Sequence, residues 1–143
     1  MPVHLVKMAV GVDDVDALRR IQAERLRVRE DGAGAVVCHR TRFRPRRARD
    51  VVADGSMYWV IKGYIRARQN VDEIVSIIGD DGEAYCELRL DPTLARTEPR
   101  PVRAFQGWRY LDGRAAPPDL ICDPGGDQAP PEMAVELRRL GLL

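Results

Sequence analysis

The residues able to support catalysis are few in this chain, and their spacing favours no reaction. The histidines are His4 and His39, and the three cysteines, Cys38, Cys86 and Cys122, form no Cys-x-x-Cys pair. Neighbours on a strand point to opposite faces of the sheet, which prevents Cys38 and His39 from forming a simple dyad or sharing one metal ion. We therefore predict no catalytic residue set, no metal site and no cofactor.

Basic residues are concentrated in one segment. Residues 39–69 carry eight arginines and one lysine against two aspartates, a net charge of +7, whereas the whole chain has a net charge of +1. Such an uneven distribution indicates an acidic partner, and nucleic acid is the most frequent one. Arginine suits this role because it forms bidentate contacts with phosphates and stacks on planar rings.

Local spacing groups these cations with aromatic side chains. Two-residue spacing on a predicted strand at 35–43 places alternate arginines on one face, and further arginines begin the helix predicted after Pro45. Aromatic rings beside such cations can stack on bases, and of the neighbours Tyr58 and Trp59 one is expected in the core and the other at a surface or cleft. The predicted nucleic-acid contacts are Arg40, Arg42, Arg46, Arg47, Tyr58, Trp59, Lys62, Arg66, Arg68, Trp108 and Arg109.

Three other interpretations of this segment stay open. The arginines can form a solvated face, paired with acids such as Glu73, Glu83 and Glu87 across a hairpin. They can also dock an acidic protein, which would make the chain a protein–protein adaptor. The third alternative is a small enzyme acting on nucleic acid or a nucleotide, with His39 in a pocket.

Length and composition predict one globular domain over residues 1–143. The 45% hydrophobic and 31% charged content supports a real core. No segment approaches the roughly 20 apolar residues that span a bilayer, and the N-terminus does not resemble a signal peptide. We therefore expect no membrane partner and a cytoplasmic location.

The periodicity predicts an α+β fold with a mostly antiparallel, curved sheet or partly closed β-barrel and flanking helices. Asp13 is the expected cap of the first helix, Gly63 joins or kinks two strands, and Asp81-Gly82 makes a hairpin turn. A Pro/Gly-rich loop is expected at about 112–131. The predicted helices are 15–29, 45–53 and 132–140, and the predicted strands are 3–10, 35–43, 56–61, 64–78, 83–90 and 105–111.

Several motifs together resemble a known family. They are MPVHLVK at 1–7, HRTR at 39–42, PRR at 45–47, YWVIKG at 58–63, RQ at 68–69, LDP at 90–92, PRP at 99–101, FQGWRYL at 105–111 and LGLL at 140–143. In this combination the chain resembles the alphaproteobacterial domain-of-unknown-function family 1489. The resemblance covers essentially the whole chain and implies a stand-alone bacterial protein without supplying a function.

A second resemblance concerns the fold. Pro45 before a short helix, a glycine after it, and a strand carrying Arg66 and Arg68 resemble the opening of PUA-related domains, including the ASCH and EVE types. That resemblance implies a small β-barrel that binds RNA or a modified base between barrel and helix. We expect the partner of this chain to be a nucleic acid, RNA in preference to DNA, or a nucleotide. ASCH domains usually carry Gly-x-Lys where residues 55–57 read Gly-Ser-Met, which leaves Lys62 or Arg66 to replace the missing lysine.

Overall fold

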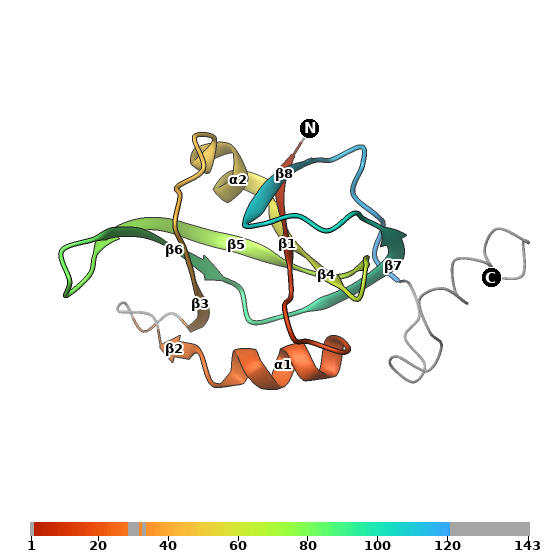
Figure 1. Cartoon of the computed structure of the whole chain (residues 1–143), viewed down its shortest axis with the longest axis horizontal. Coiled ribbons are helices and arrows are strands. Elements are labelled where there is room, and N and C mark those ends of the chain that lie inside the picture. Colours follow the sequence, from red (N-terminus) through yellow and green to blue (C-terminus); the bar gives the residue numbers. More distant parts are fainter. Residues whose placement is uncertain (1, 29–31, 33, 121–143) are drawn as a thin grey trace, which may run out of the picture.

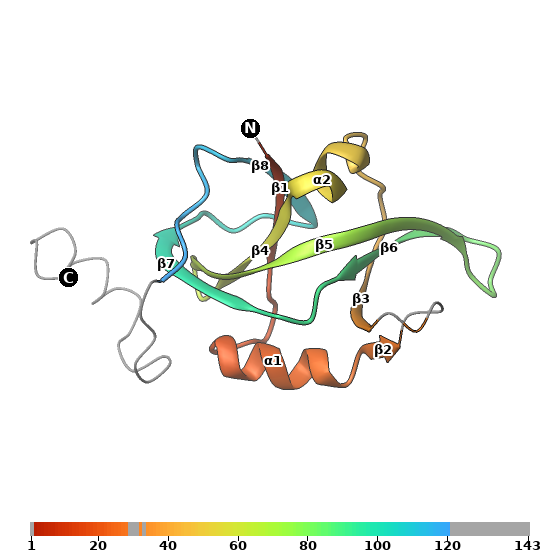
Figure 2. The ribbon, with the colours of Figure 1, turned by 180° about the vertical axis from the view of Figure 1, so that it is seen from behind.

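Eight strands form one curved sheet with two short helices packed against it (Figures 1 and 2). The computed structural model describes residues 2–28, 32 and 34–120. The predicted helix at 132–140, the end of the predicted loop and Cys122 lie outside these residues. In chain order the elements are β1 (Val3–Met8), α1 (Val15–Ala23), β2 (Leu26–Val28), β3 (Ala35–Thr41), α2 (Ala48–Asp54), β4 (Ser56–Ile61), β5 (Tyr64–Ile78), β6 (Ala84–Leu90), β7 (Ala95–Pro101) and β8 (Trp108–Asp112).

The sheet is largely antiparallel and open. Its strand order is β2-β3-β6-β5-β4-β1-β8, and β7 pairs with β5 outside this path. β1 and β4 are parallel, and the other pairs are antiparallel. The long strand β5 pairs with β4 and β7 over its first half and with β6 over its second. The predicted α+β class and curved antiparallel sheet are therefore confirmed, and because β2 and β8 are edges the sheet does not close into a barrel.

Helix α1 is shorter than its predicted range. Asp14, not Asp13, caps it, because the Ala17 amide donates to the Asp14 carboxylate at 2.7 Å. The helix ends at Ala23, and residues 26–28 form β2 on the edge of β3. The prediction of helix to residue 29 was wrong because the pairing of β2 with β3 outweighed the apolar helical spacing, which long-range contacts can do.

Helix α2 lies against the start of β1. It was predicted over 45–53 and forms at Ala48–Asp54, because residues 45–47 make the turn that leads into it. Gly55 ends the helix, as expected. A Cβ atom at Gly55 would lie 2.1 Å from the carbonyl oxygen of Val3, so glycine is required for the helix end to approach β1 this closely.

Two apolar cores occupy the two faces of the sheet. The larger core contains Leu5, Trp59 and Leu88 and is completed by both helices. The smaller core, which includes Tyr58, is covered by the segment between β7 and β8. Alternation along β4 sends the neighbours Tyr58 and Trp59 to opposite faces, as predicted. Neither helix in the described ranges is long and apolar enough to cross a membrane.

A buried amide network fixes α1 on the sheet. The Gln69 side chain, 1% exposed, accepts hydrogen bonds from Gln22 Nε2 at 2.6 Å and from Trp59 Nε1 at 2.7 Å. Its own amide group donates to Gln22 Oε1 at 3.1 Å and to the carbonyl of Asp91 at 2.8 Å. Gln69 thus uses two acceptor and two donor positions, joining α1, β4 and the end of β6 through one side chain on β5.

This network predicts a large stability loss for Gln69→Leu. The change keeps the approximate volume but leaves the buried Trp59 indole N–H and the Gln22 amide without their partners, at a cost of about 2–4 kcal/mol in unfolding free energy. Chemical denaturation measures the loss. Gln106→Leu, at an exposed glutamine, is the control and should change stability by less than about 0.5 kcal/mol. Equal stability for the Gln69 and Gln106 variants would contradict the assigned role.

Candidate nucleic-acid interface and an adjoining cleft

The segment between β3 and α2 docks on the edge strand β8 and forms a basic, aromatic surface. Trp108 donates its indole N–H to the carbonyl of Phe43 at 3.0 Å, and the Arg47 amide donates to the Tyr110 hydroxyl at 3.1 Å. The rings of Trp108 and Tyr110 meet edge to face at 5.0 Å. We name this surface the basic–aromatic platform; its residues are Arg42, Phe43, Arg46, Arg47, Trp108 and Tyr110.

The platform is unusually open for aromatic residues. Phe43 is 68% exposed and Tyr110 is 41% exposed. The guanidinium group of Arg42 lies 5.5 Å from the centre of the Phe43 ring, within the range of a cation–π contact. Exposed rings beside arginines are the combination that proteins which bind single-stranded nucleic acid use for base stacking and phosphate contacts.

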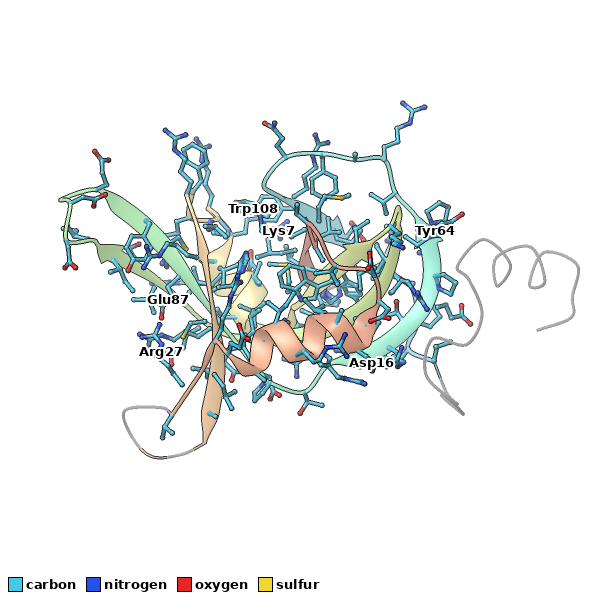
Figure 3. All side chains as sticks on the ribbon, turned by 60° about the horizontal axis from the view of Figure 1, so that its bottom comes forward. Lys7, Asp16, Arg27, Tyr64, Glu87 and Trp108 are labelled. Atoms are coloured by element: carbon cyan, nitrogen blue, oxygen red, sulfur yellow. The ribbon has the colours of Figure 1, made fainter. Side chains whose placement is uncertain are left out.

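The acids near this segment neutralise other arginines. Glu87, whose side chain is only 6% exposed, pairs with Arg27 at 2.9 Å and with Arg89 at 3.2 Å. Glu87 and Arg27 are labelled in Figure 3. Glu73 lies 3.6 Å from Arg89 as well. Within residues 2–28 and 34–120, Arg42 and Arg46 have no carboxylate partner.

Two other platform-side arginines are engaged differently. Arg47 pairs with Asp50 one helical turn away, at 3.0 Å and with both side chains more than half exposed, an arrangement that contributes little stability. Arg44 donates to the carbonyl of Ile74 at 2.9 Å and thereby fixes the segment before α2. The interpretation of a face neutralised by Glu73, Glu83 and Glu87 therefore does not apply to the platform.

Two of the predicted contacts lie outside the platform, each against another aromatic ring. Arg40, on β3, stacks over the Tyr85 ring at 3.9 Å and donates to its hydroxyl at 3.1 Å. Arg109 alternates with Trp108 and Tyr110 along β8, so its side chain lies on the other face, 5.0 Å from the Phe105 ring.

The remaining predicted contacts do not join the platform. Lys62 and Gly63 both have positive φ angles, 50° and 85°, as in a two-residue hairpin turn, and Lys62 lies 3.5 Å from Asp13. Arg68 makes a two-point ion pair with Asp119, 2.7 Å at both oxygens, and also donates to Ser56 Oγ at 3.0 Å. Arg66 is half-buried on the same strand. Arg68 is therefore a tether between β5 and the segment that follows β8, because its guanidinium group is already occupied.

Sequence reasoning missed a cleft under α1. It has a volume of about 280 Å³ and lies between α1 and strands β1, β3 and β4. Trp59, although only 4% exposed, forms part of its wall. Tyr58 is 5% exposed and belongs to the smaller core, so both β4 aromatics are buried and neither is the open stacking ring that the sequence predicted. The polar lining residues are Lys7, Gln22, Arg25 and His39.

Lys7 connects this cleft to the platform. On the sheet it is the register neighbour of Trp59 on β4 and of Trp108 on β8, and side chains of paired residues lie on one face. Figure 3 shows Lys7 and Trp108 close together. The mouth of the cleft and the platform thus form neighbouring parts of one surface.

His39 is held neutral at the wall of the cleft. Burial lowers its pKa to about 4, assisted by the positive charges of Lys7 and Arg25. Its Nδ1 atom lies 3.5 Å from the Arg25 guanidinium, which can only donate, so the neutral ring carries its proton on Nε2. Nε2 is buried and has no hydrogen-bond partner among the described residues.

The thiols near His39 are not activated. Burial raises the pKa of both Cys38 and Cys86, which disfavours their nucleophilic thiolate forms. In the part of the chain that the structure describes, no cluster of three or more His, Cys, Asp or Glu side chains could hold a metal ion.

Four residues of this surface were absent from the predicted set: Phe43, Tyr110, Lys7 and Arg25. Tyr110 lies two residues after Trp108 on a predicted strand, so alternation could have paired the two rings. Phe43 stood within the basic segment between two arginines. No sequence pattern pointed to Lys7 and Arg25, because they line one cleft only when α1 lies over the sheet.

The family comparison agrees with the sequence motifs. A family model described as "Protein of unknown function (DUF1489)" matches residues 5–143. Neither the search of curated proteins nor the search of solved structures gave a match.

The low pKa of His39 predicts a pH-dependent stability. Histidine in the unfolded chain has a pKa near 6.5. Between pH 6.5 and about 4, this histidine therefore binds a proton in the unfolded state but not in the folded state. The stabilisation is complete above pH 6.5, and roughly 3 kcal/mol of it is lost as the pH falls to about 4. Denaturation at several pH values measures the decline. His39→Gln should lessen it, and an identical pH profile for wild type and variant would refute the assignment.

Proposed function

Because the chain belongs to the DUF1489 family, whose description states no function, we propose from its geometry that it binds single-stranded nucleic acid, RNA in preference to DNA. The basic–aromatic platform is the proposed binding surface. The observation that carries the proposal is the coincidence of exposed Phe43 and Tyr110 rings with arginines that lack carboxylate partners in the described structure.

The chemistry of the platform matches a single strand better than a duplex. In a duplex the bases are stacked on one another, whereas a single strand presents base faces to the rings of Phe43, Trp108 and Tyr110. Arg42, Arg46 and Arg47 are long enough to contact phosphates beside those bases, and Arg40 extends the cationic surface along β3. The resemblance to PUA-related domains supports RNA as the preferred strand.

An acidic protein is the competing partner for the same surface. Arginine, tyrosine and tryptophan are also enriched at protein–protein interfaces. The two partners differ in what the exposed rings do: a base stacks on Phe43, whereas an acidic protein side chain needs only the cations. A change at Phe43 that spares the arginines therefore separates them.

The first prediction concerns salt. Arg40, Arg42, Arg46 and Arg47 allow about four phosphate contacts, so the logarithm of the binding constant for single-stranded RNA should fall with the logarithm of salt concentration with a slope of roughly −3. Fluorescence anisotropy at several salt concentrations measures it. A matched single-stranded DNA should bind more weakly. No binding to either strand at low salt would exclude the proposed function.

The second prediction distinguishes the contribution of the arginines to RNA binding from that of the aromatic rings. Arg46→Ala with Arg47→Ala should weaken RNA binding and reduce the salt slope by about 1.4, with little change in stability because both side chains are exposed. Phe43→Ala should cost about 1–3 kcal/mol of binding energy and leave the slope unchanged.

The matched control is Arg20→Ala with Arg103→Ala, which removes two exposed arginines, one on α1 and one in the segment between β7 and β8. This control should retain most of the binding and so show that position, as well as charge, matters. Binding that depends equally on both arginine pairs and not at all on Phe43 would favour the acidic protein partner.

A further inference from the structure

The cleft under α1 holds two cations and no carboxylate among its lining residues. Lys7 is half-buried, and within the described structure its side chain makes no hydrogen bond or ion pair. Burial lowers the pKa of Lys7, because the charged ammonium group is disfavoured when it is withdrawn from water. A cation withdrawn from water without a partner costs free energy, and a bound anion would offset that cost.

Arg25 supplies the second positive charge. Its guanidinium donates toward His39 Nδ1, and His39 is kept neutral by burial and by the charges of Lys7 and Arg25. Both cations therefore act on the same point of the cleft wall. The neutral imidazole holds Arg25 at the cleft without neutralising it, so two positive charges remain available to one ligand.

The rest of the lining is apolar. Met8, Val12, Leu18, Ile21 and Val37 surround the space together with Trp59. The volume of about 280 Å³ is close to the lower end of small-molecule sites, so the occupant is small. The lining thus presents a cationic end and an apolar end, which matches an acid group on a compact apolar or aromatic body.

We propose that the cleft between α1 and the sheet is a binding site for a small organic anion, with its acid group on Lys7 and Arg25 and its apolar body against α1 and Trp59. This site goes beyond the proposed nucleic-acid surface, and it can be occupied whether or not RNA binds the platform. Two sources supply this ligand chemistry: the phosphate of a single nucleotide, or the carboxylate of a free organic acid.

Trp59 offers a direct measurement. Trp108 is the other tryptophan of the chain, so Trp108→Phe leaves Trp59, in the wall of the cleft, as the reporter of fluorescence. This protein is titrated with benzoate and with uncharged benzyl alcohol, and separately with guanosine 5′-monophosphate and with guanosine. In at least one of the two pairs the anion should bind at least tenfold more tightly than its uncharged counterpart.

The two lysines of the chain form a matched pair of variants. Lys7→Met, in the same background, should weaken binding of the anion at least tenfold, and Lys7→Arg should retain part of it. Lys62→Met removes the other lysine, which is exposed beside Asp13, and should leave the affinity unchanged. Tighter binding of the nucleotide identifies phosphate as the source, and tighter binding of benzoate identifies a carboxylic acid.

A second measurement uses the unaltered chain. A bound anion opposes the positive field of Lys7 and Arg25, so it should raise the pKa of His39 from about 4, as followed by NMR titration of the two imidazoles. His4, which accepts a hydrogen bond from the Ser56 amide at the other end of β1, is the internal control and should not respond.

Three results would overturn the inference: equal affinity for charged and uncharged probes, no effect of Lys7→Met, or no response of His39 at saturating anion. Failure of RNA binding alone would leave the cleft site standing, since none of the variants that test RNA binding changes a residue of the cleft. The Trp108→Phe background is used only for the small probes.

Discussion

The position of α1 depends on the buried amide of Gln69 more than on the helix itself. A nine-residue helix is too short to be stable alone, so its place must come from tertiary contacts. Gln69 supplies the polar part of those contacts through Gln22, and Leu18 and Val15 supply the apolar part by entering the larger core. A third tether is the ion pair of Asp16 with the buried Arg96 on β7, at 3.0 Å. Without these tethers the cleft would lose one wall.

Trp59 connects that anchoring to the surface chemistry. Its indole N–H is bonded to Gln69, one side of its ring meets His39 at 5.3 Å, and its strand neighbour is Lys7. The next strand continues the row with Trp108, whose indole holds the segment before α2. One line of side chains across β4, β1 and β8 therefore fixes both the cleft and the platform. A ligand in the cleft would contact the same row on which the platform rests.

The sequence was sufficient for features set by local periodicity. Alternation along β6 placed Leu88 in the core and Glu87 and Arg89 on the other face of the strand, and the order of helices and hairpins gave the α+β class. The sequence was insufficient where a contact joins segments that are far apart in the chain. Arg68 looked like a free cation until Asp119, far along the chain, proved to hold it. Lys7 is a lone cation on an apolar strand, and its isolation is visible only once α1 covers it.

Some arginines of the basic segment, residues 39–69, make contacts within the protein, and others lie exposed at the platform. The segment's net charge of +7 overstates the field available to a partner, because Arg44 is bonded to a backbone carbonyl and Arg68 to Asp119. Glu87 on β6 is already engaged too, since its carboxylate pairs with Arg27 and Arg89. What remains is concentrated at the platform, where Arg42 and Arg46 lie beside exposed rings. A uniformly solvated face would share its carboxylates among all the arginines. Among the described residues of the platform, Arg47 pairs with Asp50 at an exposed position, whereas Arg42 and Arg46 have no carboxylate partner.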